Sequence, residues 1–476
     1  MGKQQKLGFW ILTSLVVGNM VGSGIFMLPR SLAEAASPAG VMLAWLFTGL
    51  GVLFISLVFG NLGKRKPELN GGPQIYAKEL FKKGSQAATL TGFMATWGYW
   101  IGNLAGNIAI ITTFASYLST FFPIMTSQAT VLTIGGFDLK MGNLLTFLVC
   151  TIVLWGTHAL VHKGIEGAGK INLAATAAKV TGFFIFIIIG LAAFDAANVT
   201  PFIAEKTSEA GHSVGMLGQI NAAAVATLWA FIGVESAVVF SSRAKKQTDV
   251  KRATILGLTL TLAIYIGIST LVMGLLPQEA LMNSDKPLID AIETVLGPIG
   301  GKLLAALGLI SLIGSTIGWV MLAAEVPSAA AKQGLFIPRF MKENEKGIPA
   351  FSLLCTNLLG QIFIFSTISS TISEAFNFII YIATLSYLIP YLISATFQMK
   401  LIITGETYQR RRERIADGII GGFATLYAIY VLIAGTSDLK TFLLGMALLA
   451  SGILFYSFVR KEETVVIPSS VIKENN

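Results

Sequence analysis

The chain has 476 residues, of which 54% are hydrophobic and only 12% are charged, whereas a soluble domain has about 25% charged residues. This composition excludes a soluble globular protein and indicates an integral membrane protein. The net charge of +9 would suit a nucleic-acid partner, but the positions of the cations, given below, exclude that interpretation. The two cysteines, Cys150 and Cys355, both lie in apolar runs, which argues against a disulfide framework and against a zinc site.

Twelve apolar segments follow one another with short connections, and each is long enough to be a membrane span. We predict helical spans at about residues 7–33, 40–60, 88–121, 142–161, 171–194, 216–240, 253–275, 301–330, 351–371, 374–397, 417–436 and 441–459. The connections leave no room for a separate soluble domain. The first segment runs past the length of a signal peptide and lacks a cleavage site of small residues, so we expect it to be retained as a span.

The lysine and arginine residues set the predicted orientation. Under the twelve-span count, 27 of the 34 fall on one side of the membrane, one (Lys179) lies within a span, and six fall on the other side: Arg30, Lys140, Lys206, Lys286, Lys302 and Lys440. Because Lys and Arg concentrate in cytoplasmic loops, we expect both termini, including the polar tail at 460–476, to be cytoplasmic. The excess of positive charge therefore reflects topology rather than a nucleic-acid partner.

The first span contains Gly22, Ser23 and Gly24 near its middle, where each glycine costs a helix roughly 1 kcal/mol relative to alanine. A break at this depth frees backbone groups that lipid cannot satisfy, so it is tolerated only where those groups face a cavity or a ligand. The half-helix after such a break would present its positive N-terminal end to a carboxylate. The alternative is a close contact between helices, which small residues also favour.

The sixth span repeats this pattern, with Gly233 at its centre and the ionisable Glu235 two residues later. Interrupted helices five spans apart are typical of an inverted five-plus-five repeat with a binding site at the membrane midplane. A carboxylate at this depth is costly, so we expect Glu235 to face the bundle interior and to have a partner or a function. The alternative is a structural carboxylate that caps the second half-helix.

Five further residues near the middle of spans are candidates for the same site. They are the aromatic residues Tyr99, Trp229 and Trp319 and the charged residues Lys179 and Glu325. An aromatic face can hold a substrate cation, although most aromatic residues in a helical bundle simply pack. We therefore treat the aromatic residues as candidates rather than as assigned ligands.

At these residues the sequence resembles the amino acid, polyamine and organocation transporter superfamily, and within it the basic amino acid/polyamine antiporters. The resemblance is carried by Gly-Asn-Met-Val-Gly-Ser-Gly-Ile-Phe at 18–26 and by Leu-Trp-Ala-Phe-Ile-Gly-Val-Glu-Ser at 228–236, and it extends over nearly the whole chain. Stretches that begin at Arg65, Ser241 and Lys342 most resemble arginine/ornithine antiporters. This implies an all-α, LeuT-like fold of twelve helices, a five-plus-five inverted repeat in which the first and sixth helices are discontinuous.

The resemblance also implies how the broken helices would bind a substrate. The substrate carboxylate would lie on the backbone around Ser23 and Gly24. The substrate amino group would meet carbonyls near Asn19, Met20 and the break at Gly233. Both groups would therefore be recognised mainly by backbone atoms.

Side chains from other spans complete the implied site. Asn107 would help to bind the polar head of the substrate, and Trp319 would contact its side-chain cation. Trp229 would stack over the substrate as a gate. Glu235 and Tyr99 would act in gating or proton sensing.

Lys179 departs from the arginine/agmatine members of the family, which lack a lysine in the fifth span. In this fold its ammonium could reach the junction of the broken first span and the eighth span, where it would donate to carbonyls near Gly18 and to Ser315 or Thr316 and replace a sodium ion. The alternative is that the side chain snorkels to the cytoplasmic interface, because it lies only roughly 13 Å inside Lys170.

These features predict a single transporter domain over residues 1–476, with repeats at about 7–195 and 216–397 and two extra helices at about 417–459. The leading hypothesis is a cell-membrane antiporter that exchanges arginine, or a similar cationic amino acid, for ornithine or agmatine. The alternative is a proton-coupled permease for neutral or aromatic amino acids.

An enzyme is not expected, because the three histidines form no HExxH motif and no carboxylate dyad is present. We expect no cofactor and no metal. The expected partners are amino acid or amine substrates and the lipid bilayer, and the sequence leaves open whether two copies form a homodimer.

Overall fold

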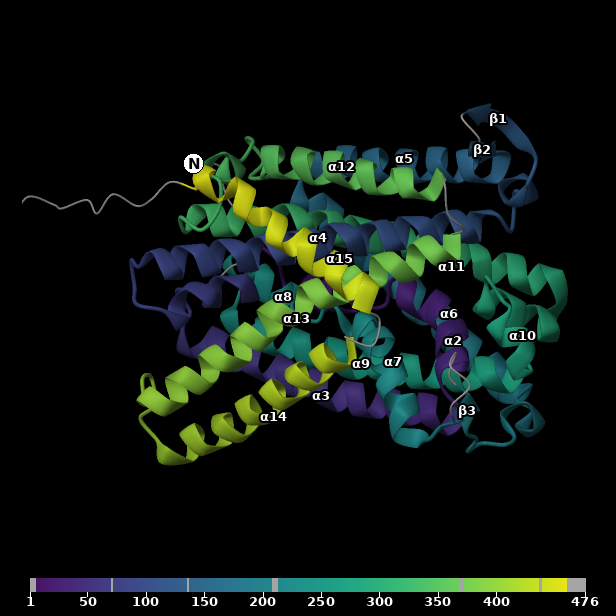
Figure 1. The fold of residues 1–476 in the computed structure, drawn as a ribbon, viewed down its shortest axis with the longest axis horizontal. Coiled ribbons are helices and arrows are strands. Elements are labelled where there is room, and N and C mark those ends of the chain that lie inside the picture. The colour runs from purple at the N-terminus through teal and green to yellow at the C-terminus, as the bar shows by residue number, and fades with distance from the viewer. Residues whose placement is uncertain are drawn as a thin grey trace, which may run out of the picture.

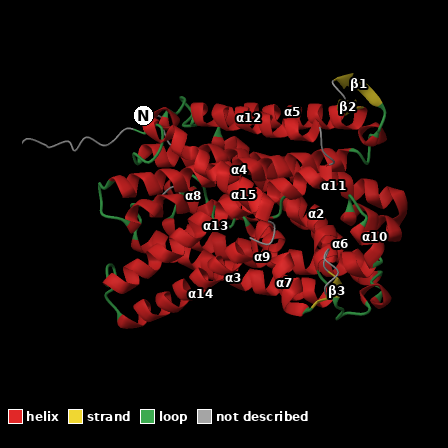
Figure 2. Cartoon of the chain, viewed as in Figure 1, coloured by secondary structure: helices red, strands yellow, loops and turns green. Residues whose placement is uncertain are grey.

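The computed structural model describes residues 6–69, 72–134, 137–207, 213–368, 372–435 and 439–459. The predicted tail at 460–476 lies outside the described residues. Helices make up most of the described chain, and the short strands are confined to two hairpins at one end of the long axis (Figure 2). The helices pack side by side along that axis (Figure 1), as expected for a bundle that crosses a membrane.

Helices of the first half of the chain are α1 (Phe9–Met20), α2 (Ser23–Ala35), α3 (Pro38–Arg65), α4 (Gln86–Leu118), α5 (Met141–His162) and α6 (Ile165–Ala192). Those of the second half are α7 (Met216–Phe231), α8 (Ser236–Val239), α9 (Gln247–Leu275), α10 (Gln278–Met282), α11 (Pro287–Lys332), α12 (Ala350–Ile364), α13 (Ile372–Thr404), α14 (Arg411–Gly435) and α15 (Leu439–Ala450). A 3-10 helix at Pro73–Leu80 lies between α3 and α4.

Two antiparallel hairpins occur in connections for which the sequence predicted no regular structure. They pair β1 (Thr130–Ile134) with β2 (Phe137–Lys140), and β3 (Lys206–Thr207) with β4 (Ser213–Val214). They leave the predicted all-helical class intact, because both lie between helices and neither contributes a strand to a common sheet.

Nine helical segments in the described part of the chain are long and apolar enough to cross a membrane, counting α1 and α2 together as Phe9–Ala35. Three shorter apolar segments occupy other predicted spans, at Met216–Phe231, Ala350–Ile364 and Phe442–Phe458. The chain is therefore a multi-pass membrane protein. These twelve segments overlap the twelve regions predicted from the sequence.

The eighth predicted span, 301–330, belongs to a longer helical run, α11. The run contains a kink at Gly297, which has φ of 66° and is followed by Pro298. Glycine adopts this left-handed backbone conformation readily, and proline has no N–H to continue the hydrogen-bond pattern of the preceding helix. The predicted span therefore begins just beyond a real break between two helical pieces.

The interior of the bundle is formed by the helices that carry the candidate site residues. In the most apolar stretch of Phe9–Ala35, 94% of the residues are buried, and in that of Gln86–Leu118 the share is 89%. In that of Met141–His162 it is only 33%. Helix α4 packs against both α11 and α13. Large apolar side chains are exposed on outer helices, for example Ile152 and Leu426, as expected for a surface that faces lipid.

Helix α14 is attached to α3 by a polar cluster centred on Asp417. The Asp417 carboxylate accepts hydrogen bonds from Asn61 Nδ2 at 2.9 Å, from Arg65 Nε at 2.7 Å and from the Tyr408 hydroxyl at 3.1 Å. The Arg65 guanidinium also lies 3.8 Å above the Tyr408 ring. This cluster joins the last part of the described chain to the second predicted span.

We expect Asp417→Ala to lower the free energy of unfolding by about 1–3 kcal/mol, because it leaves buried donors of Asn61 and Arg65 without their acceptor. Thermal unfolding of the purified protein in detergent measures the change. The control is Glu406→Ala, which removes the half-exposed partner of Lys66 and should cost at most about 1 kcal/mol. Equal losses in the two variants would contradict a structural role for the Asp417 cluster.

Candidate functional site

The first span is interrupted at Val21 and Gly22, between the end of α1 and the start of α2. Ser23 and Gly24, predicted to lie within the break, form the first turn of α2. No side chain caps this helix in the described chain, and the hydroxyl of Ser23 is buried without a hydrogen-bond partner. The N-terminal amides of α2 therefore point into the protein interior and can donate hydrogen bonds to an anionic group.

The sixth span is interrupted over residues 232–235, between α7 and α8. Gly233 has φ of 106°, and a Cβ atom added to it would lie only 2.8 Å from Asn19 Cβ. Asn19 Nδ2 in turn donates to Ser236 Oγ at 2.8 Å. The two breaks therefore contact each other, and glycine is needed at 233 for both its backbone conformation and its lack of a side chain.

Several carbonyls at the breaks already accept hydrogen bonds from side chains of other helices. Trp319 Nε1 donates to the Asn19 carbonyl at 2.9 Å, and the single hydrogen of the Tyr265 hydroxyl is shared between the carbonyls of Met20 and Ala230. Sequence reasoning missed Tyr265, because a tyrosine within an apolar span looks like a packing residue. A carbonyl oxygen has two lone pairs, so the Asn19 carbonyl can accept a second donor, whereas the Met20 carbonyl also accepts from the Gly22 backbone N–H at 2.8 Å.

Two tryptophans lie together beside the breaks. The ring centroids of Trp229 and Trp319 are 5.8 Å apart, and both side chains are buried. A Cβ atom added to Gly106 would lie 2.2 Å from the Trp319 ring, which places α4 directly against this indole. The structure thus brings Trp319, Trp229 and Gly106, the residue next to Asn107, into one region.

Glu235 lies at the second break as the acceptor of three hydrogen bonds. The donors are the Tyr99 hydroxyl at 2.8 Å, the Tyr391 hydroxyl at 2.5 Å and the Gly233 backbone N–H at 3.2 Å. The side chain is fully buried, and its partners come from α4 and α13 as well as from its own loop. The sequence predicted that this buried carboxylate would have a partner or a function. The structure provides two partners, the hydroxyls of Tyr99 and Tyr391.

Sequence reasoning missed two tyrosines of α13, Tyr387 and Tyr391. The Tyr387 ring lies 4.9 Å from that of Tyr99 and 6.1 Å from that of Trp319, and its buried hydroxyl has no partner among the described residues. Neither tyrosine stands out in an apolar segment, because aromatic residues are common in helical bundles. Pairing across helices, which only the fold provides, makes them candidates.

Lys179, on α6, lies at the first break and not at the membrane surface. Its ammonium donates to Ser315 Oγ at 2.6 Å, to the Gly18 carbonyl at 3.2 Å and to the Val21 carbonyl. The residue is only 3% exposed, so the snorkelling alternative is wrong. The hydrogen-bond partners expected for Lys179 are confirmed, and all three donor hydrogens of the ammonium are accounted for.

Some polar atoms near the breaks have no hydrogen-bond partner among the described residues. They are Asn19 Oδ1, Ser23 Oγ and Trp229 Nε1, and all three residues are buried; Asn107 Oδ1, on α4, is also buried without a partner in the described chain. A buried polar atom without a partner costs about 1–3 kcal/mol. Such atoms also occur elsewhere in the bundle, but Asn19, Ser23 and Trp229 belong to the helix ends that flank the two breaks.

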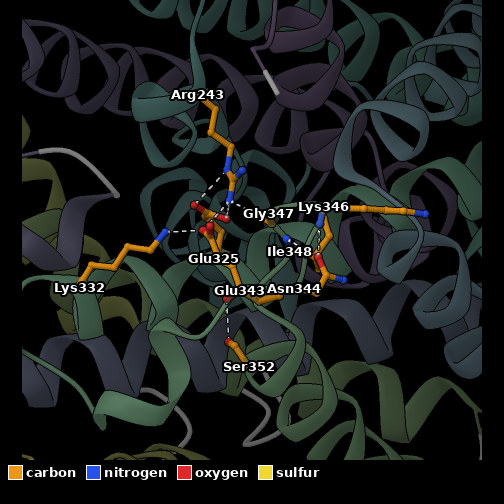
Figure 3. A network of polar contacts seen from close by, with 10 residues as sticks. Arg243, Glu325, Lys332, Glu343, Asn344, Lys346, Gly347, Ile348 and Ser352 are labelled. Atoms are coloured by element: carbon orange, nitrogen blue, oxygen red, sulfur yellow. Dashed lines mark hydrogen bonds and ion pairs between the residues drawn. The ribbon is translucent and has the colours of Figure 1, made fainter. Parts of the chain in front are cut away.

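A second polar network lies where α8, the end of α11 and the connection before α12 meet (Figure 3). Arg243 is completely buried and donates to Glu325 through Nε at 3.2 Å and Nη2 at 2.9 Å. Its Nη2 also reaches the Gly347 carbonyl at 3.1 Å and Glu343 Oε1 at 3.4 Å. Lys332 completes the network by pairing with Glu343 at 2.6 Å.

This network pairs Glu325 with Arg243, two charged residues to which the sequence assigned no role. Glu325, singled out as a mid-membrane carboxylate, is the partner of Arg243. Burial works against the charge of Arg243, but Glu325 outweighs it and raises the pKa of Arg243 above its ordinary value. The backbone of Arg243 and Lys245 also pairs with Leu7, just before α1. The network therefore includes the ends of both interrupted spans that lie away from the breaks.

No group of three histidine, cysteine, aspartate or glutamate side chains that could hold a metal ion occurs within the described ranges. The polar groups at the breaks are amides, hydroxyls, indoles and single charges, which suit hydrogen bonding to a small polar molecule. Two interrupted membrane helices that contact each other, beside buried aromatic and charged residues, indicate the class of protein: a membrane transporter.

The comparisons with known proteins identify the family within this class. A family model described as amino acid permease matches residues 7–455, and the chain belongs to that family. This confirms the resemblance to the amino acid, polyamine and organocation transporter superfamily. The protein is therefore a transporter and not an enzyme, as the sequence predicted.

Several relatives match over almost their full length. A putative arginine/ornithine antiporter of Bacillus subtilis is 50% identical over 96% of this chain and 98% of its own. An arginine/ornithine antiporter of Pseudomonas aeruginosa is 37% identical over 96% and 92%, respectively. An arginine/agmatine antiporter of Chlamydia abortus is 34% identical over 95% and 89%.

Gly233→Ala tests the contact between the two breaks. We expect it to destabilise the protein by about 1–3 kcal/mol, the cost of holding an L-residue in such a backbone conformation, with an added clash against Asn19. Thermal unfolding in detergent is the measurement. Gly156→Ala is the matched control, because an added Cβ meets nothing within 4 Å at that position of α5; a Gly233→Ala protein as stable as this control would refute the predicted contact.

Proposed function

We propose that this protein is an antiporter that takes up arginine and exports ornithine or agmatine by alternating access. The observation that carries this proposal is the contact between the two helix breaks, where unpartnered polar atoms lie beside two indole rings. The names of the relatives support a cationic amino acid as the substrate. They give no support to the alternative of a proton-coupled permease for neutral or aromatic amino acids.

We further propose a LeuT-like arrangement with twelve spans and both termini in the cytoplasm, in a cell membrane. Nine long and three shorter apolar segments support the count, and the alternation of cationic loops supports the orientation. The repeats would occupy about 7–195 and 216–397, followed by two extra helices at about 417–459. The whole of 1–476 would form one domain in the lipid bilayer.

Binding of the substrate would use both breaks. Its carboxylate would accept hydrogen bonds from the α2 amides at Ser23 and Gly24, where the helix dipole favours an anion. Its amino group would donate to carbonyls near Asn19, Met20 and the break at Gly233, first to the Asn19 carbonyl, which accepts only from Trp319 among the described residues. Each of these substrate groups would satisfy backbone atoms that the unwound segments leave inside the bundle.

The substrate side chain would extend among the aromatic residues. Its cation would lie against Trp319, a contact worth about 0.5–2 kcal/mol depending on desolvation, with Asn107 binding the polar head. The Tyr387 ring lies 6.1 Å from that of Trp319, and its hydroxyl, which has no partner among the described residues, would offer the same cation an acceptor. Trp229 would cover the bound substrate as a gate.

Alternating access requires contacts that form in one state and break in another. The Glu235 cluster with Tyr99 and Tyr391 would be such a contact at the level of the substrate. The Arg243–Glu325 network would be a second one, because it joins the ends of α1 and α8 to α11. Opening this side of the bundle would separate Arg243 from Glu325.

Counterflow in liposomes tests the proposed exchange. Vesicles containing the protein are loaded with arginine, ornithine, agmatine, lysine or nothing, and the entry of labelled arginine is measured. We expect rapid entry only into vesicles that hold a cationic exchange partner, because the empty carrier should reorient slowly. Entry into empty vesicles as fast as into ornithine-loaded ones would refute obligatory exchange, and no entry at all would refute arginine as the substrate.

Lys179→Ala tests the proposal that this ammonium replaces a sodium ion at the first break. The variant loses charged hydrogen bonds worth about 1.5–3 kcal/mol each, and we expect exchange to slow by roughly 10- to 100-fold. Exchange by the parent should be unchanged when sodium is replaced by potassium or choline.

Lys170→Ala is the matched control for this experiment, since it removes an exposed lysine from the same helix, α6. Thermal unfolding of both variants shows whether slowed exchange reflects a loss of folded protein. Normal exchange by folded Lys179→Ala between pH 5 and 8 would remove Lys179 from the mechanism and leave proton sensing to Glu235.

A further inference from the structure

A cavity of about 430 Å³ lies where α3 ends and α9 begins, beside α8. This volume lies within the range of small-ligand sites. Four cationic side chains line the cavity: Lys64, Lys66, Lys251 and Arg252. The residues that line it include no aspartate or glutamate and none of the residues proposed to bind the transported substrate.

Three of the four cations have no acidic partner among the described residues. Lys66 pairs with Glu406, and this hydrogen bond raises the pKa of Lys66. Within the described chain, no ion pair or side-chain hydrogen bond involves Lys64, Lys251 or Arg252. The cavity therefore carries a local excess of positive charge, which favours an anionic ligand.

The backbone around the cavity adds to this preference. Gln247 and Thr248, the first residues of the 29-residue helix α9, also line the cavity. No side chain caps this helix in the described ranges, so its first amides are available at the positive end of the helix dipole. The aliphatic stem of Lys251 packs on Gly60, where an added Cβ would lie 2.9 Å from Lys251 Cγ, and this contact restricts where the ammonium can lie.

The floor of the cavity is apolar. Phe59, Tyr76 and Val250 line it, and all three are buried. A small, fully hydrated anion would gain nothing from these side chains. A ligand that fits both the cationic and the apolar residues of the lining must carry an anionic group joined to an apolar portion.

We propose that this cavity binds the headgroup of an anionic phospholipid of the cytoplasmic leaflet. The phosphate would lie among Lys64, Lys251 and Arg252, and the glycerol and the first carbons of an acyl chain would cover the apolar floor. The ends of membrane helices lie at the depth of the headgroups, and basic pockets on this side suit anionic lipids. The site is independent of which amino acid the protein transports.

Occupancy of the site would bear on the broken sixth span. Val238 of α8 and Ser241, which follows it, line the same cavity. A bound lipid would therefore contact α8, the part of the interrupted sixth span that lies next to Arg243. We expect an anionic lipid to stabilise the conformation in which α8 lies against α3 and α9.

The test measures lipid binding by the full-length protein purified in detergent. The unfolding temperature is followed as phosphatidylglycerol, phosphatidylcholine or inorganic phosphate is added, since a ligand that binds the folded state raises it. We expect stabilisation by phosphatidylglycerol alone. The triple variant Lys64→Gln, Lys251→Gln and Arg252→Gln keeps polar side chains but removes three charges, and should bind this lipid roughly 10- to 100-fold more weakly.

The matched control carries Arg410→Ala, Arg411→Ala and Arg412→Ala, which removes three exposed cations that do not line the cavity. It should keep the parent affinity. An equal loss in the control would show attraction by surface charge alone, and equal stabilisation by inorganic phosphate would show a site for free anions; either result overturns the proposal. If the triple variant does not fold, Lys251→Glu alone should weaken binding, and unchanged binding would also refute the site.

Discussion

Every backbone N–H and C=O group inside the bundle needs a hydrogen-bond partner, because lipid supplies none. The two interrupted spans are the places where the helices themselves do not meet this need. Side chains of other helices supply part of it: Lys179 donates to the carbonyls of Gly18 and Val21, and the Tyr265 hydroxyl shares its one hydrogen between those of Met20 and Ala230. What these side chains leave unsatisfied is what a substrate with a carboxylate and an amino group can complete.

The two buried ionisable residues at the breaks match the backbone groups beside them. The C-terminal end of α1 presents carbonyls and the negative end of the helix dipole, and Lys179 is a cation that can only donate hydrogen bonds. Glu235 can only accept when ionised, and it lies beside the Gly233 N–H and two tyrosine hydroxyls. Each charge is therefore placed where its burial is compensated, and a change at either break alters that compensation.

The breaks and the Arg243 network involve the same two helices at different depths. Asn19 joins α1 to Ser236 at the breaks, and Leu7, just before α1, pairs with the backbone of Arg243 and Lys245. Helices α1 and α8 are thus linked to each other both at the breaks and at their far ends. This double link favours their movement as one unit against α11. The proposed lipid cavity lies beside this same unit, at α8.

The sequence by itself determined the membrane class, the twelve apolar regions, both helix breaks and the family, because composition, cation positions and glycines at mid-span are local features of the chain. It also singled out Lys179, Glu235 and Trp319. The partners of Lys179 were expected from the resemblance, but only the tertiary structure decided those of the two carboxylates: Tyr99 and Tyr391 for Glu235 and Arg243 for Glu325. These pairs join residues far apart in the chain, and a tyrosine in an apolar helix acquires a polar role only when packing brings a buried charge to its hydroxyl.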